Sequence, residues 1–121
     1  MSYYTYYNMD TKSKILTPEV IEEINKWLKE RSLISYALCE GEFHTDYHGN
    51  NYGVWDGSDL CEWHDHEEDM EALSRAFPEV AFCLHGNGED QYDKWDEYWL
   101  NGECEACRAK VYMPKPIRIK W

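Results

Sequence analysis

"YDKWDEYWLNGECEACRAKVYM", residues 92–113, carries the clearest fold signal in the chain. At its centre, Asn101-Gly102 separates two runs of alternating residues, which is the typical sequence of a two-residue β-hairpin turn. A helix over residues 90–100 is disfavoured, because no apolar stripe of helical period is found there. The cross-strand pairs that this turn predicts are Leu100–Glu103, Trp99–Cys104, Trp95–Arg108 and Asp93–Lys110. The third is a favourable cation–π pair and the fourth an ion pair, so the predicted register is chemically sensible.

The segment before the hairpin, "EVAFCLHG" at residues 79–86, reads as a strand. Val80, Phe82 and Leu84 alternate with Ala81 and Cys83, so both sides of such a strand are apolar. A strand of this kind is typical of the centre of a sheet that is covered on both faces. We therefore predict a central strand at this position.

Two helices are predicted. The first covers residues 18–31, with Thr17 as N-cap, Pro18 in the first turn and an apolar stripe through Ile24. The second covers residues 65–76, where Asp65 and Glu68 have the spacing of a capping box. Both helices carry charged residues on the side away from their apolar stripes, so each is expected to pack on a sheet through one side only.

Three further strands complete the expected fold. "YYTYYN" at residues 3–8 and residues 33–40 are rich in β-formers, and a short strand is expected at 52–55 within a loop over residues 43–59. The resulting order is β-α-β-(β)-α-β followed by a hairpin. The sequence therefore predicts one α+β domain over residues 1–121: a ferredoxin-like split βαβ sheet with two helices and an added C-terminal hairpin.

Charge is unevenly distributed along the chain, whose net charge is -12. Residues 36–105 carry 19 acids against Arg75 and Lys94, whereas residues 106–121 carry five bases and no acid. Such a field repels nucleic acid and anionic membranes and attracts basic protein surfaces. The start of the chain lacks signal-peptide features, no run approaches about 20 apolar residues, and the five cysteines are an odd number, so we expect reduced thiols and a cytoplasmic location.

A resemblance adds to this picture. The segment "EWHDHEEDMEALSRAFPEVAFCLHGNGEDQYDKWDEYWLNGECEACRAKVYMP", residues 62–114, is similar to small proteins of phages and plasmids in its "DMxxLSxxFP", "FxLxGxGE", "WxxY" and "NG" elements. It also distantly resembles the YubB-like, ferredoxin-like domain. The resemblance implies an α+β fold and a mobile-element origin, and carries no catalytic residue over. Small acidic phage proteins often act against host defence, and some imitate nucleic acid.

Metal and enzyme functions are the alternatives. Zinc could be held by Cys104 and Cys107, by Cys61 with His64 and His66, or by Cys83 with His85. In a regular hairpin, however, Cys104 and Cys107 point to opposite faces of the sheet. A small hydrolase would need a pocket around the acids and histidines of residues 62–69, and no P-loop, nucleophile elbow or dinucleotide fingerprint is present.

The sequence therefore favours a non-catalytic protein without a cofactor or metal. We expect it to bind a basic, nucleic-acid-binding surface of a bacterial host protein, in the manner of an anti-CRISPR inhibitor of a guided defence nuclease, without contacting nucleic acid or membrane itself. A zinc-bearing regulatory or scaffold domain is the first alternative, and a small hydrolase the second. The expected partner-binding residues are carboxylates and tryptophans: Glu62, Asp65, Glu67, Glu68, Asp69, Glu71, Glu89, Asp90, Asp93, Asp96, Glu97, Trp55, Trp63 and Trp95.

Overall fold

The computed structural model describes residues 5–31, 41–45, 52–55, 60–61, 63–88, 93–109 and 118–119. It is an α+β fold with one antiparallel sheet in the order β2-β3-β1-β5-β6-β7, and β4 also pairs with β1. The strands are β1 (Thr5–Lys12), β2 (Phe43–Thr45), β3 (Tyr52–Trp55), β4 (Leu60–Cys61), β5 (Ala81–Asn87), β6 (Lys94–Leu100) and β7 (Glu103–Arg108). The helices are α1 (Pro18–Glu30) and α3 (His66–Ala76).

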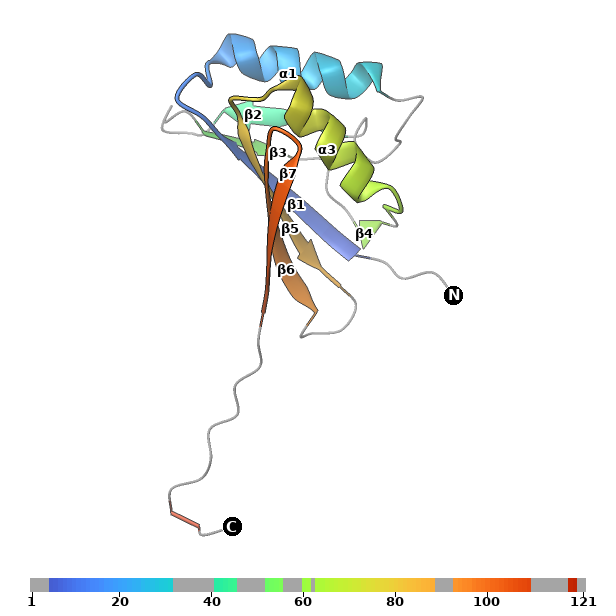
Figure 1. The fold of residues 1–121 in the computed structure, drawn as a ribbon, viewed down its shortest axis with the longest axis vertical. Coiled ribbons are helices and arrows are strands. Elements are labelled where there is room, and N and C mark those ends of the chain that lie inside the picture. The colour runs from blue at the N-terminus through green and yellow to red at the C-terminus, as the bar shows by residue number, and fades with distance from the viewer. Residues whose placement is uncertain are drawn as a thin grey trace.

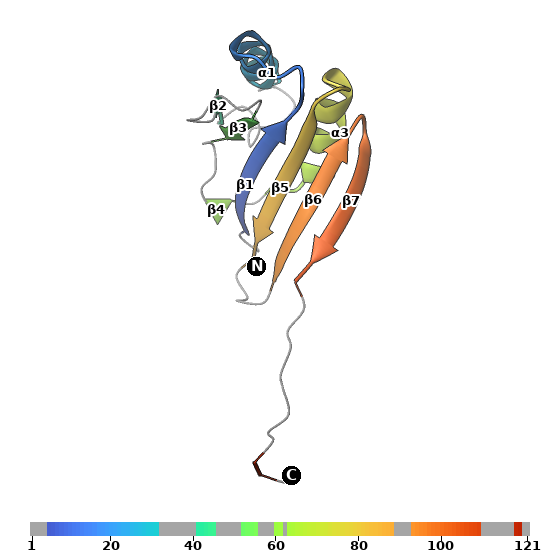
Figure 2. The same ribbon diagram turned by 90° about the vertical axis from the view of Figure 1, so that its left-hand side faces the viewer.

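Both described helices lie on the same face of the sheet, so neither of them covers the opposite face (Figure 1). Figure 2 shows β1, β5, β6 and β7 side by side with α3 behind them. Burial along β5 alternates accordingly, because Phe82 and Leu84 are buried whereas Ala81 and Asn87 are exposed. The prediction that this strand is central is confirmed, but the prediction that it is covered on both faces is wrong.

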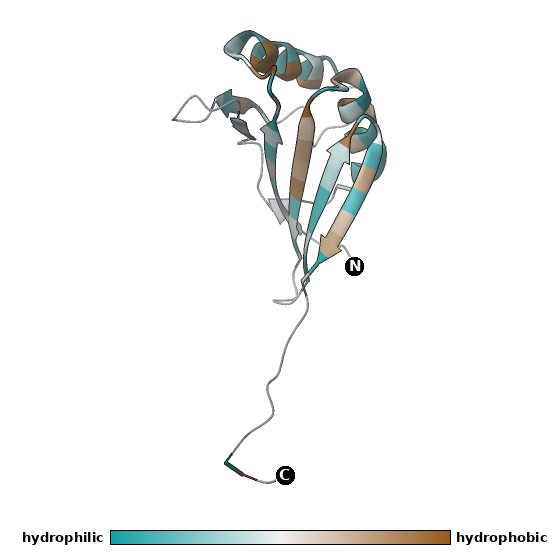
Figure 3. Ribbon diagram, turned by 60° about the vertical axis from the view of Figure 1, so that its left-hand side comes forward, coloured by the Kyte–Doolittle hydropathy of each residue, from teal (hydrophilic) through white to brown (hydrophobic). Residues whose placement is uncertain are grey.

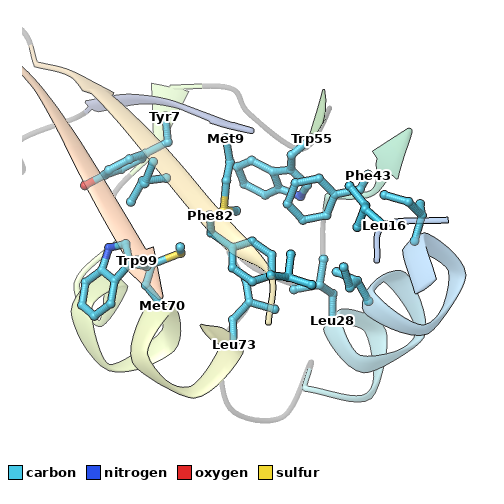
Figure 4. Close-up of a cluster of buried hydrophobic side chains, with 14 of the residues drawn as sticks. Tyr7, Met9, Leu16, Leu28, Phe43, Trp55, Met70, Leu73, Phe82 and Trp99 are labelled. Atoms are coloured by element: carbon cyan, nitrogen blue, oxygen red, sulfur yellow. The ribbon is translucent and has the colours of Figure 1, made fainter. Parts of the chain in front are cut away.

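The core fills the space between the sheet and the two helices (Figure 4). Phe82 from the central strand is 1% exposed, and Leu28 of α1 and Leu73 of α3 are both fully buried. The phenyl rings of Phe43 and Phe82 lie 6.0 Å apart, centroid to centroid. Removal of this apolar surface from water is the main force that holds the helices on the sheet.

The helix N-termini differ in how they are capped. The hydroxyl of Thr17 accepts a hydrogen bond from the backbone N–H of Val20 at 3.3 Å, as the sequence predicts for an N-cap. Asp65 occupies the cap position of α3, but its side chain makes no capping hydrogen bond, so the predicted capping box does not form. Its backbone carbonyl nevertheless starts the helix by accepting from the N–H of Asp69 at 2.9 Å.

The C-terminal hairpin forms with the predicted register. Asn101 and Gly102 have φ angles of 46° and 82°, as a two-residue hairpin turn requires. Trp95 lies opposite Arg108, whose guanidinium carbon is 5.2 Å from the centre of the indole ring. Lys110 lies outside the described residues, and Asp93 instead meets Arg108 at 3.3 Å. Figure 3 shows hydrophilic and apolar bands alternating along β7, as expected for a strand with two distinct faces.

Substitution of Gly102 tests this turn. A side chain there would adopt a left-handed φ and would meet the Arg75 side chain at 2.4 Å. We expect Gly102→Ala to lower the free energy of unfolding by about 1–2 kcal/mol, measured by denaturant titration. Asn101→Gly is the matched control, because glycine adopts the same φ without strain and should leave the stability within about 0.5 kcal/mol of the parent.

The remaining predicted elements have mixed outcomes. The strands expected from "YYTYYN" and at 52–55 are confirmed as β1, from Thr5 onward, and β3. The strand predicted at 33–40 lies wholly outside the described residues. Neither described helix has the length and apolar character needed to cross a bilayer.

Candidate functional site

The open side of the sheet, here called the uncovered face, carries most of the chemically distinctive side chains. It consists of the residues of each strand that point away from α1 and α3, and these alternate with the core residues. Across β1, β5, β6 and β7 the register aligns them in two neighbouring rows, Asn8–His85–Asp96–Cys107 and Asp10–Cys83–Tyr98–Glu105.

The imidazole of His85 lies at the centre of these rows and bridges two carboxylates. Its Nε2 is 2.9 Å from Oδ2 of Asp10, and its Nδ1 is 2.6 Å from Oδ1 of Asp96. The three side chains come from β5, β1 and β6, so the central ladders of the sheet fix their spacing. With both ring nitrogens facing carboxylates, the arrangement suits an imidazolium that donates two hydrogen bonds.

The electrostatics of His85 follow from this arrangement. Partial burial lowers the pKa of His85, but the hydrogen bonds and negative charges of Asp10 and Asp96 raise it more, and the net pKa lies above its ordinary value. The ion pairs therefore contribute stability fully below the unfolded-state pKa of about 6.5, and this contribution is lost as the pH rises through the folded-state pKa.

Removal of either carboxylate tests this account. We expect Asp10→Asn and Asp96→Asn each to lower the pKa of His85, as followed by NMR titration of its ring protons. The free energy of unfolding of each variant should also fall less between mildly acidic and alkaline pH than that of the parent. If the pKa of His85 is the same in both variants as in the parent, the bridging geometry is wrong.

Cys83 lies beside His85 on the same side of β5. Its Sγ is 3.9 Å from Nδ1 of His85, and the thiol is half-buried. Burial, followed by the charges of Asp96 and Asp10, raises the pKa of Cys83 to about 11. Cys83 is therefore a protonated thiol at neutral pH. A thiol is a poor nucleophile, because the thiolate is the reactive form.

A second polar cluster is located under α3, on the helix side of the sheet. Glu97 is buried, and it accepts hydrogen bonds from the indole N–H groups of Trp95 at 2.8 Å and Trp99 at 3.0 Å. His66 Nε2 lies 2.9 Å from the same carboxylate. Burial alone raises the pKa of Glu97, but its hydrogen bond and charge interaction with His66 and the two indoles lower it overall. The cluster ties α3 to β6.

Several predicted partner-binding residues are internal. Trp55 is 3% exposed and Trp63 is 6% exposed, so neither is available to anchor a partner, contrary to the sequence-based prediction. Asp69 is buried too, and accepts a hydrogen bond from the Trp63 indole at 2.7 Å. The Trp63–Asp69 pair and buried Glu97 stabilise the core, because a buried carboxylate must be hydrogen-bonded and an indole N–H needs an acceptor. The buried indole N–H of Trp55 has no hydrogen-bond partner among the described residues.

The other predicted carboxylates are divided between two surfaces. Asp65, Glu67 and Glu68 are exposed at the start of α3, and Glu71 pairs with Arg75 at 2.7 Å. Asp96 lies on the uncovered face. Asp93 directly precedes β6 and half-buried Trp95 lies at its start, where the indole covers Gly86 so closely that a Cβ atom there would meet the ring at 2.3 Å. Glu62, Glu89 and Asp90 lie outside the residues whose side chains are described.

The cysteines and histidines that the sequence suggests as zinc ligands are also divided between the two sides of the sheet. Cys104 pairs with Trp99 on the helix side and Cys107 with Asp96 on the uncovered face, so the C-x-x-C pair is split as expected for a regular hairpin. The imidazole of His66 already pairs with the carboxylate of Glu97, and the side chain of Cys61 is outside the described residues. Within the described part of the chain, one group brings three potential metal-binding atoms within 4.8 Å of one another: Cys83, His85 and Asp96.

Sequence reasoning recognised Cys83 and His85 but missed their acidic partners. Two residues spaced i, i+2 in a strand share a face, which was the available signal. Asp96 could have been placed next to His85 only with the β5–β6 register, and Asp10 is 75 residues away from His85 in the chain. A long-range ladder of this kind leaves no local pattern in the sequence.

Comparison with known proteins adds no assignment. No protein-family model, curated protein or solved structure matches the chain.

Proposed function

We propose that the chain is a non-catalytic protein whose uncovered face binds a basic surface of another protein. The observation that carries this proposal is the combination of large apolar and acidic side chains on a sheet face that neither described helix covers. Tyr98 and Leu100 are each 50% exposed, and Tyr6 is 56% exposed. The carboxylates of the same face are Asp10, Asp96, Glu103 and Glu105.

Charge complementarity determines the kind of partner. The net charge of -12 repels phosphate backbones, so a direct role in binding nucleic acid is disfavoured. Lys12 and Lys94 lie at the ends of the uncovered face, and exposed Glu103 and Glu105 project from the edge strand β7. Carboxylates with exposed tyrosine nearby are suited to arginine-rich surfaces, because guanidinium groups pair with the former and stack on the latter.

The acidic start of α3 is a weaker candidate for the contact surface. Asp65, Glu67 and Glu68 are exposed there, but the neighbouring Trp63 is buried and supplies no exposed aromatic group. These acids also lie on the helix side of the sheet. At physiological salt, interactions between exposed charges are screened beyond about 8 Å, so we assign these acids a small effect on the association rate rather than direct contact with a partner on the other face.

The partner class we propose is a protein that normally binds nucleic acid. The resemblance to phage and plasmid proteins that the sequence motifs of residues 62–114 predict would favour a host defence nuclease, such as a CRISPR effector, whose basic channel would accept carboxylates in place of phosphates. This part of the proposal is an analogy between proteins. Its physical basis is that dispersed negative charge can occupy a site built for a polyanion.

We also infer that the fold is a ferredoxin-like split βαβ sheet with an added hairpin. The order β2-β3-β1-β5 is the arrangement expected when two β-α-β units interleave in one antiparallel sheet, with α1 and α3 as the connecting helices. The hairpin β6–β7 then extends the sheet beyond β5. In such folds the face opposite the helices remains available for binding.

Affinity capture tests the proposal directly. The full chain would be immobilised and exposed to a nuclease-treated bacterial lysate that contains candidate defence complexes, over a series of salt concentrations. We expect retention of a basic nucleic-acid-binding protein that weakens steeply as salt increases. Retention that is insensitive to salt, or retention of acidic proteins only, would overturn the electrostatic basis of the proposal.

A further inference from the structure

We propose that Cys83, His85 and Asp96 form a zinc-binding site on the uncovered face, with Asp10 holding the His85 ring from behind. The proposal is independent of the proposed function. It rests on the juxtaposition of one sulfur, one nitrogen and one oxygen atom, Sγ, Nδ1 and Oδ1, all within 4.8 Å of one another.

The backbone that carries these donors is well fixed. Cys83 and His85 are alternate residues of β5, and Asp96 lies directly opposite His85 on β6. Strand β5 is paired along both edges, with β1 and with β6. A site on central strands is pre-organised, so little order has to be gained when the metal binds.

The position of Asp10 is the second observation that points to a metal. Histidine ligands of zinc commonly donate their other ring N–H to a carboxylate, which fixes the tautomer and orients the ring. Asp10 Oδ2 lies 2.9 Å from Nε2 of His85 and is placed to accept that hydrogen bond. This leaves Nδ1, the nitrogen that faces Cys83 and Asp96, to bind the ion.

The donor types select zinc among the common cations. Magnesium and calcium prefer oxygen ligands, whereas a thiolate together with an imidazole and a carboxylate matches zinc. Cys107 lies opposite Asp96 on the uncovered face but outside the group of donors within 4.8 Å of one another, so a fourth ligand would be a water molecule or, after a side-chain movement, the Cys107 thiol. His85, Asp96 and Cys107 also line a hollow of about 810 Å³ at this end of the sheet, which gives the ion a path from solvent.

Zinc binding requires two local changes. Nδ1 and Oδ1 are now 2.6 Å apart, and in a tetrahedral zinc site two such ligand atoms are separated by about 3.3 Å, so the half-exposed Asp96 side chain must rotate slightly. Zn²⁺ also replaces the thiol proton of Cys83 and the Nδ1 proton of His85, and both protons pass to solvent. Affinity should therefore rise with pH.

The test is a titration of zinc into the reduced, chelator-treated full chain against a competing chromophoric chelator, repeated with Co²⁺ for its spectrum. We expect one ion per chain, tetrahedral cobalt bands and a thiolate-to-cobalt charge-transfer band. Cys83→Ser should abolish that band and weaken zinc binding at least about 100-fold, and Asp10→Asn, which removes only the carboxylate behind the ring, should weaken it about 10–100-fold.

Cys104→Ser is the matched control, because Cys104 is exposed on the other side of the sheet and should leave affinity unchanged. Far-ultraviolet circular dichroism would confirm that each variant is folded. Loss of binding in Cys104→Ser would place the metal elsewhere, and retention of parental affinity in Cys83→Ser or in the alternative variant Asp96→Asn would overturn the site. Stoichiometry well below one ion per chain would overturn it as well.

Discussion

Replacement of Glu97 by alanine is expected to lower the free energy of unfolding by about 3–5 kcal/mol. The carboxylate accepts hydrogen bonds from two indole N–H groups and pairs with His66, all within 3.0 Å. Alanine would leave Trp99 with a buried, unpaired donor and would open a cavity between α3 and β6. Chemical denaturation of the parent and the variant, compared at the same pH, measures the difference.

Two further variants show whether this loss comes from the buried network. Glu97→Gln keeps one carbonyl oxygen as acceptor and should lose less stability than Glu97→Ala, whereas Glu105→Ala removes an exposed acid and should change stability by less than about 0.5 kcal/mol. Equal losses for Glu97→Ala and Glu105→Ala would show that the cluster beneath α3 contributes little.

The second large effect concerns partner binding. Simultaneous replacement of Glu103 and Glu105 by lysine is expected to weaken binding to a captured basic partner about 100-fold at physiological salt, which corresponds to about 2.7 kcal/mol. Both side chains are exposed on the uncovered face, so reversal turns attraction into repulsion at the proposed contact. Surface plasmon resonance with the immobilised partner would measure the dissociation constant.

Glu67→Lys with Glu68→Lys is the matched control. It makes the same change in net charge at exposed positions, but on α3, on the helix side of the sheet. We expect it to reduce the association rate and to change affinity less than about threefold, because screening limits its influence on the other face. If this pair abolishes binding and the β7 pair does not, the contact lies on α3.

Local chemistry explains which parts of the fold were predictable. The Asn101-Gly102 turn and the Thr17 cap were found because a few neighbouring residues determine them. The side of β5 that remains open was not found, because Ala81 and Cys83 look apolar whether or not a helix covers them. Coverage depends on where both helices pack, and that is a property of the whole topology rather than of one strand.

The site was harder to predict than the fold. The number of acidic residues predicted the negative charge of this region. It could not distinguish exposed Glu67 from buried Asp69, because the two carboxylates lie on different sides of α3. Tryptophan was expected at the surface because of its amphipathic ring, yet Trp63 satisfies its N–H internally through Asp69. The Asp10–His85–Asp96 bridge needed two strand registers at once, and neither can be read from a single segment.

Competition between this chain and nucleic acid for the captured partner tests whether the uncovered face occupies a nucleic-acid-binding surface. The partner would be loaded with a labelled oligonucleotide, the protein added in increasing amounts, and the bound label followed by fluorescence anisotropy. We expect full displacement of the oligonucleotide by the parent and little displacement by the variant with Glu103→Lys and Glu105→Lys. A stable ternary complex, in which the partner holds both the oligonucleotide and this protein, would contradict this expectation.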